Sequence, residues 1–207
     1  FEQLKDQLPD SKTMDKVLTF KNTETIYSNV PKEEKEETKQ IESNDGMTIQ
    51  MKFDTPEEIF YYNSEGQEAI QQRSFMGRTF LVEGNKTFKW KITGDTKEIL
   101  GYSCTKATTG DSTQIVAWFT STIPVFSGPD VYNGLPGLIL EVDIDEGKRQ
   151  ILATNVVTGP VDGPVVAPSK GKKVTTEQYE KIMKKKIEEM QQEFEGKGNF
   201  LFITSDQ

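Results

Sequence analysis

Alternating apolar and polar residues recur in short runs along this chain, and turn-forming residues separate the runs. In one run Phe88, Trp90 and Ile92 alternate with threonine and lysine. Successive side chains of a strand point to opposite faces, so such a run has one apolar and one polar face, as is typical of antiparallel sheets. With roughly ten such runs, the sequence predicts a mainly β fold of the α+β class.

One helix is predicted near the C-terminus, over residues 175–195. Thr175 followed by Gln178 resembles a capping box, and apolar side chains then recur at spacings of three and four residues. We expect the apolar face of this helix to pack on the sheet. For the sheet itself we prefer a single antiparallel layer curled into a half-barrel, and a two-sheet sandwich is the alternative.

At 207 residues the chain is long enough to form a single domain, residues 1–207, around one core. A charged segment rich in Lys and Glu covers residues 31–45. Such a composition cannot bury enough apolar area to order itself, so we expect a mobile loop there. Directly after it, Met47, Ile49 and Met51 alternate with polar residues and predict a strand.

The charge and residue content argue against several classes of function. A formal net charge of −8 disfavours binding to nucleic acid or to anionic lipid surfaces, both of which need a basic surface. No apolar run approaches the ~20 residues of a transmembrane helix. The first residues lack the apolar core of a signal peptide, so an exported protein would be present in processed or trimmed form.

The chain contains no histidine, which removes the commonest general base and the commonest transition-metal ligand. Its single cysteine, Cys104, excludes an internal disulfide and is the obvious candidate nucleophile. A thiol nucleophile needs a base or a cation to lower its pKa, and Lys106 offers only weak electrostatic help. We therefore favour a buried core residue over a thiol-dependent hydrolase. No catalytic residue, metal ligand or cofactor is predicted.

A turn rich in glycine and proline opens into an apolar strand after Tyr132. The residue pairs Asn133-Gly134 and Pro136-Gly137 each supply a residue that tolerates a positive φ. Strict alternation in the strand that follows places four apolar side chains on one face, namely Leu138, Leu140, Val142 and Ile144.

The connection that contains this turn, residues 123–137, is unusually apolar for a loop. Either it folds back over an open end of the sheet as a plug, or it presents Leu135 and Phe126 to a partner. Trp118 lies nearby on a strand that is apolar on both faces, so one of those faces can meet a cavity or a partner. The residues predicted to bind a partner or ligand are Trp118, Phe126, Pro129, Tyr132, Leu135 and Pro136.

The residues Gly134-Leu135-Pro136-Gly137-Leu138-Ile139 resemble the motif that names the GLPGLI family of envelope proteins from Bacteroidetes-type bacteria. Further blocks at residues 90–92, 97–107, 117–124 and 128–129 resemble the same family in the expected order. The resemblance implies export to the periplasm or the outer membrane, in genomes often beside genes for TonB-dependent transporters. It implies no catalytic residues.

We therefore expect a non-enzymatic accessory or binding protein of the cell envelope. Its expected partner is an outer-membrane protein, such as a TonB-dependent transporter or assembly, contacted through the loop 123–137. The alternative is a periplasmic carrier of an apolar ligand such as a lipid or lipopeptide.

Overall fold

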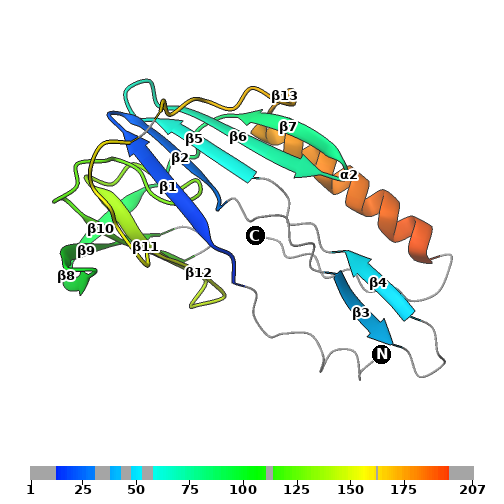
Figure 1. The fold of residues 1–207 in the computed structure, drawn as a ribbon, viewed down its shortest axis with the longest axis horizontal. Helices are drawn as coiled ribbons and strands as arrows, with labels where there is room; N and C mark the ends of the chain where they lie inside the picture. The colour runs from blue at the N-terminus through cyan, green and yellow to red at the C-terminus, as the bar shows by residue number, and fades with distance from the viewer. Residues whose placement is uncertain are drawn as a thin grey trace.

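A computed structural model describes residues 13–30, 38–42, 48–52, 58–110, 114–161 and 163–195, with only the backbone described at 38–42, 48–52 and 193–195. Over these residues the protein is mostly β, with two large sheets and a C-terminal helix (Figure 1). The predicted fold class is confirmed.

The larger sheet has six strands in the order β1-β2-β5-β6-β7-β13. Neighbouring strands are antiparallel except β13, which returns at the end of the fold to pair parallel with β7. The strands are β1 Lys16–Lys21, β2 Glu24–Asn29, β5 Glu58–Asn63, β6 Glu68–Phe75, β7 Arg78–Glu83 and β13 Lys172–Thr175.

The second sheet has five antiparallel strands in the order β12-β11-β10-β9-β8. Each strand pairs with its neighbour in sequence, so the sheet is a simple meander. The strands are β8 Trp90–Ile99, β9 Tyr102–Thr109, β10 Ile115–Thr120, β11 Leu138–Ile144 and β12 Arg149–Leu152.

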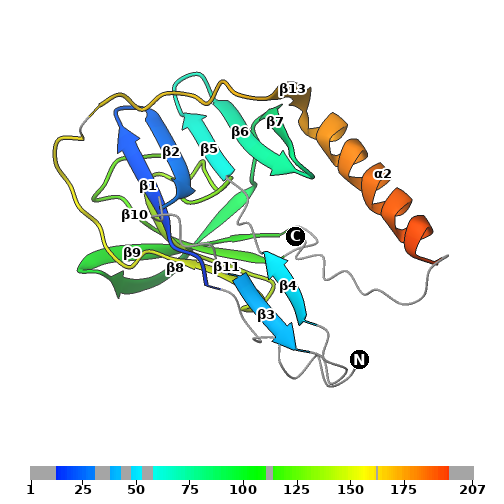
Figure 2. The same ribbon diagram turned by 45° about the vertical axis from the view of Figure 1, so that its right-hand side comes forward.

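The single curled sheet that we preferred is wrong, and the two-sheet alternative describes the structure. The break falls after β7: residues 84–89 have no strand structure, and β8 pairs only with β9 in the new sheet. The strands of the two sheets run in clearly different directions (Figure 2). Local alternation predicts strands and hairpins, but it does not show where one sheet ends and the next begins.

A third, two-stranded sheet joins β3 Thr38–Glu42 to β4 Thr48–Lys52. The strand predicted after the charged segment is present as β4. Within the segment 31–45, where we expect a mobile loop, residues 38–42 form strand β3, because pairing with β4 supplies backbone hydrogen bonds whatever the side-chain composition. Residues 31–37 and 43–45 lie outside the described part of the chain.

The predicted alternation along β11 is interrupted by a β-bulge. Trp118 of β10 lies opposite Glu141, whereas Phe119 lies opposite Ile139, so Leu140 is the extra residue. Beyond the bulge Val142 packs in the same core cluster as Ile139, and Leu140 packs in another. The bulge thus lets β11 contribute large apolar side chains to both faces of its sheet.

Helix α2, Thr176–Glu195, covers one end of the six-stranded sheet. Its capping box is present: the Gln178 backbone N–H donates to Thr175 Oγ1, and the Thr175 N–H donates to Gln178 Oε1. Tyr179 packs against Phe80 at a centroid distance of 5.5 Å, within a core cluster that includes Val174. Both views show the C-terminal half of α2 extending past the edge of the sheet (Figures 1 and 2).

Candidate functional site

The apolar loop 123–137 lies between the two sheets. On one side the hydroxyl groups of Thr25 in β2 and Ser127 in the loop form a buried hydrogen bond of 2.9 Å. On the other side Tyr132 and Leu135 join a core cluster built on the five-stranded sheet. The loop therefore fills the space between the two sheets, whereas its apolar sequence suggested either a plug over an open end of one sheet or a contact surface.

Hydrogen bonds hold the loop in this position. Ser127 and Asn133 form an isolated antiparallel bridge across the loop. The indole N–H of Trp90 donates to the Asn133 carbonyl oxygen at 2.8 Å. A Cβ added at Gly128 would lie 2.6 Å from the Cβ of Ile139, so only glycine allows the loop to approach β11 this closely.

The six predicted binding residues fall into two groups. Leu135 is 1% exposed, Tyr132 is 6% exposed and Pro129 is buried, so these three have almost no surface with which to meet a partner. Phe126 is 50% exposed and Pro136 is also exposed. Burial of Leu135 removes it from the contact surface that the sequence suggested for it.

Trp118, the sixth residue, lies half-buried on the face of the five-stranded sheet that carries Cys104. The ammonium group of Lys97 lies 4.3 Å from its ring centroid and forms an ion pair of 2.6 Å with Glu141. A cation held over an indole ring by a carboxylate stabilises this arrangement, and it also covers part of the ring. A partner at Trp118 would have to displace Lys97.

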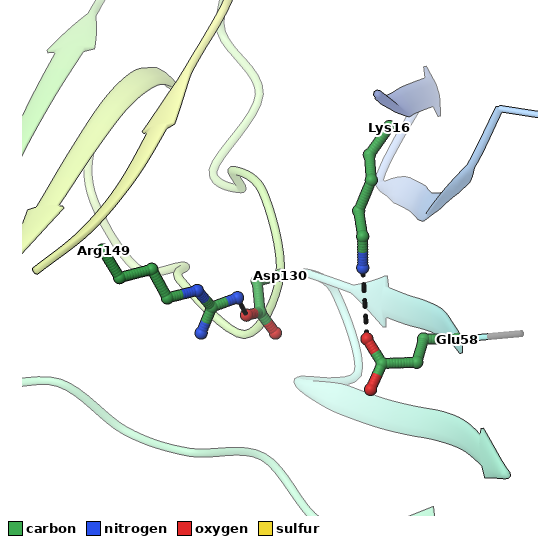
Figure 3. A network of polar contacts seen from close by, with 4 residues as sticks. All are labelled: Lys16, Glu58, Asp130 and Arg149. Atoms are coloured by element: carbon green, nitrogen blue, oxygen red, sulfur yellow. Dashed lines mark hydrogen bonds and ion pairs between the residues drawn. The ribbon is translucent and has the colours of Figure 1, made fainter. Parts of the chain in front are cut away.

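A polar cluster between the sheets was not predicted from the sequence. Asp130 forms an ion pair of 2.5 Å with Arg149, and its side chain is only 6% exposed (Figure 3). Its backbone has a positive φ of 57°, which is uncommon for a residue other than glycine. Its second oxygen, Oδ1, is buried and has no hydrogen-bond partner among the described residues.

A second ion pair belongs to the same region. Lys16 Nζ lies 3.1 Å from Glu58 (Figure 3). The same ammonium group stands over the rings of Tyr27 and Phe60, at 5.4 and 5.8 Å from their centroids. The guanidinium carbon of Arg73 also lies near Phe60, at 5.3 Å from the centroid of its ring. The inner face of the six-stranded sheet therefore brings cations and aromatic rings together.

Burial raises the pKa of Tyr27 and of Tyr132 to about 12; nearby Asp130 adds to this rise, and Arg149 opposes it. Both phenols are therefore protonated at neutral pH. A cavity of about 10 Å³ is lined by Phe60, Asp130 and Tyr132 among others. This volume accommodates about one water molecule, which is too small for an organic substrate.

No sequence signal points to this cluster. Asp130 and Arg149 are nineteen residues apart and belong to no motif, and Lys16 and Glu58 are forty-two residues apart. The pairs form only because the loop lies between the two sheets and β5 lies two strands away from β1.

Cys104 is fully buried in the core, as we favoured. Its Sγ donates to the Tyr102 carbonyl oxygen at 3.5 Å. Burial raises the pKa of the thiol, and the weaker effect of the cation Lys97 does not reverse this. Lys106, the expected source of electrostatic help, instead lies 3.4 Å from Asp95. A protonated, inaccessible thiol has neither property of a nucleophile.

An open groove lies between α2 and the six-stranded sheet. Its volume is about 410 Å³. Phe80 of β7 and Ile182 of α2 supply apolar walls, and the lining residues are Arg78, Thr79, Phe80, Lys172 and Ile182. This groove was not predicted from the sequence, because it forms only when β13 returns to β7 and brings α2 with it.

Within the described residues, no three His, Cys, Asp or Glu side chains come together in positions suited to a metal ion. Over the same part of the chain, the structure contains no helix with the length and apolarity that crossing a membrane requires.

A family model described as "Protein of unknown function (Porph_ging)" matches residues 108–141. The matched segment runs from the end of β9 through β10 and the apolar loop 123–137 into β11, so it contains all six predicted binding residues. No curated protein matches the chain.

Among solved structures, the chain is similar to a structure of PNGF-II in space group P21, with a TM-score of 0.54 and 19% sequence identity. The match covers 84% of this chain and 30% of the PNGF-II chain. A PNGF-II structure in space group C2 has a TM-score of 0.49 at 21% identity, over 77% of this chain and 29% of that chain. This chain thus spans about a third of the PNGF-II chain, and the likeness concerns the fold alone.

Proposed function

We propose that this chain is a GLPGLI-type accessory protein of the cell envelope that binds an outer-membrane protein through Phe126. The resemblance of residues 134–139 to the GLPGLI motif supports the family and the compartment. The match of residues 108–141 to a family of unknown function agrees with that resemblance.

The observation that carries the proposal is the exposure of the Phe126 side chain on a loop whose other large apolar side chains are mostly buried. Its side chain is 50% exposed, while the next residue, Ser127, is hydrogen-bonded to β2. The Phe126 carbonyl oxygen also accepts a hydrogen bond from the Gly134 N–H at 3.3 Å. An aromatic side chain on a fixed backbone has few conformations to lose on association, so it suits the role of an interface anchor.

Site-specific photo-crosslinking in the native bacterium tests this proposal. A photoreactive phenylalanine analogue at position 126 should crosslink to one outer-membrane protein. The same analogue at Val166, which is 60% exposed on the connection before β13, is the matched control. The same products from both positions, or none from position 126, would refute the role of Phe126.

A carrier of an apolar ligand is the second candidate, and the groove beside α2 favours it. The space between the sheets is too small for an acyl chain, whereas about 410 Å³ lies within the usual range of roughly 300–1,000 Å³ for ligand pockets. Native mass spectrometry of protein purified from its source should then show a bound lipid-like mass. Protein that carries no such mass would argue against this candidate.

A further inference from the structure

The groove between α2, β7 and β13 combines apolar walls with a cationic rim. Phe80 forms its buried floor and Ile182 lies half-buried at its side. Arg78 and Lys172 line the same groove and are exposed. None of the described residues that line the groove is acidic. A ligand here therefore meets the half-buried side chain of Ile182 and two positive charges together.

Among the described residues, neither cation of the groove is neutralised by an ion pair. Lys172 and Arg78 form no ion pair with any described residue, although the protein has a net charge of −8. The next residue along β13, Lys173, points to the opposite face of the sheet and forms an ion pair of 2.8 Å with Glu83. Of these adjacent lysines, Lys173 is thus neutralised by Glu83, and Lys172 is not neutralised by any described residue.

We propose that this groove binds the anion of a single-chain fatty acid. A carboxylate suits Arg78, whose planar guanidinium binds carboxylates through two parallel hydrogen bonds, with Lys172 as a second positive charge. The hydrocarbon chain would lie mainly against Ile182, because Phe80 is only 4% exposed at the bottom of the groove. An apolar surface this narrow suits one acyl chain rather than the two of a phospholipid. The inference rests on the carrier candidate and is independent of Phe126.

The apolar surface continues beyond the groove. Met183 of α2 packs against the same core cluster, and Ile187 and Met190 follow at spacings of four and three residues in the C-terminal half of the helix. Met76, in the turn before Arg78, is 50% exposed. A chain longer than the groove therefore has further apolar side chains beside it.

Isothermal titration calorimetry with dodecanoate below its micelle concentration tests the proposal. We expect one site on the wild type, and a loss of affinity of about tenfold or more for Arg78→Glu and for Lys172→Glu, because each removes a charge-assisted contact. Lys173→Glu, on the opposite face, is the matched control and should change affinity by less than about twofold. All three residues are exposed, and circular dichroism verifies that each variant is folded.

Two other ligands distinguish a fatty-acid site from a general carrier of apolar ligands. Monolaurin has the same chain without the charge and should bind about tenfold more weakly than dodecanoate. Equal binding of the two would refute a fatty-acid site but leave the apolar carrier standing. No binding of either, an equal loss for Lys173→Glu, or a preference for phosphatidylglycerol vesicles would overturn the proposal.

Discussion

The substitution Leu135→Ala tests whether the apolar loop is a structural layer or a contact surface. Leu135 is 1% exposed and packs in one cluster with Tyr132, Ile139 and Val142. Truncating a buried leucine removes its transfer free energy and leaves a cavity, at a cost of about 2–5 kcal/mol. Two sheets hold the surrounding side chains in place, so we expect little collapse and a cost of about 3–5 kcal/mol.

Urea denaturation followed by circular dichroism measures this cost directly, because the midpoint falls while the slope stays constant if only stability has changed. For a chain of this size each 1 kcal/mol lowers the melting temperature by about 2–4 °C, so the expected shift is roughly 6–20 °C. Phe126→Ala is the matched control from the same loop. Because half of that side chain is already in water, its cost should stay below about 1 kcal/mol.

The contrast between the two variants decides the outcome. A loss of less than about 1 kcal/mol for Leu135→Ala would show that the loop is not packed between the sheets in solution. A loss for Phe126→Ala as large as that for Leu135→Ala would remove the distinction between a buried layer and an exposed anchor, and with it the basis of the proposed interface.

Three further measurements test the interior of the protein. Asp130→Asn should lower the free energy of unfolding, measured in urea, by about 1–3 kcal/mol, because it breaks the ion pair with Arg149. The loss should lie at the lower end of this range, because Arg149 is partly exposed and can turn to solvent. Tyr27 and Tyr132 have a pKa of about 12 when folded against about 10 when unfolded, so their contribution to stability is complete below pH 10 and is lost as the pH rises from 10 to 12. Tyrosinate absorbance, recorded together with circular dichroism, should therefore show that Tyr27 and Tyr132 ionise above pH 11 or when the protein unfolds. Ionisation of these two side chains near pH 10 in the folded state would contradict their burial. The Cys104 thiol should resist Ellman's reagent at neutral pH and react at once in urea, whereas rapid labelling of folded protein would show that it is accessible.

Local signals in the sequence predicted the elements of the fold well. In the alternating run around Trp90, Trp90 and Ile92 lie in β8, whereas Phe88 precedes the strand. The spacing of Thr175 and Gln178 marks the start of α2. These features depend on residues a few positions apart. The bulge at Leu140 escaped prediction because Leu138, Leu140 and Val142 are all apolar, and both faces of this sheet are covered. When both faces are buried, alternation no longer reports which side chain points where.

The split into two sheets and the polar cluster were beyond what the sequence could reveal. Asp130 meets Arg149 because the loop crosses between the layers, and the groove lined by Arg78 and Lys172 depends on the parallel return of β13 to β7. Both arrangements join residues far apart in the chain through packing. A single sequence contains no periodic signal for such pairs.

The apolar loop shows how one observation can support two opposite interpretations. An apolar connection indicates a partner if it lies on the surface, and a core layer if it lies between sheets. The structure assigns most of the loop, including Leu135, to the core, and this accounts for its composition without any partner. The apolar composition of the loop is therefore no longer an argument for binding. Phe126 still needs an explanation, because its neighbours can be buried without a half-exposed aromatic side chain at this position. The proposed interface consequently rests on that residue alone.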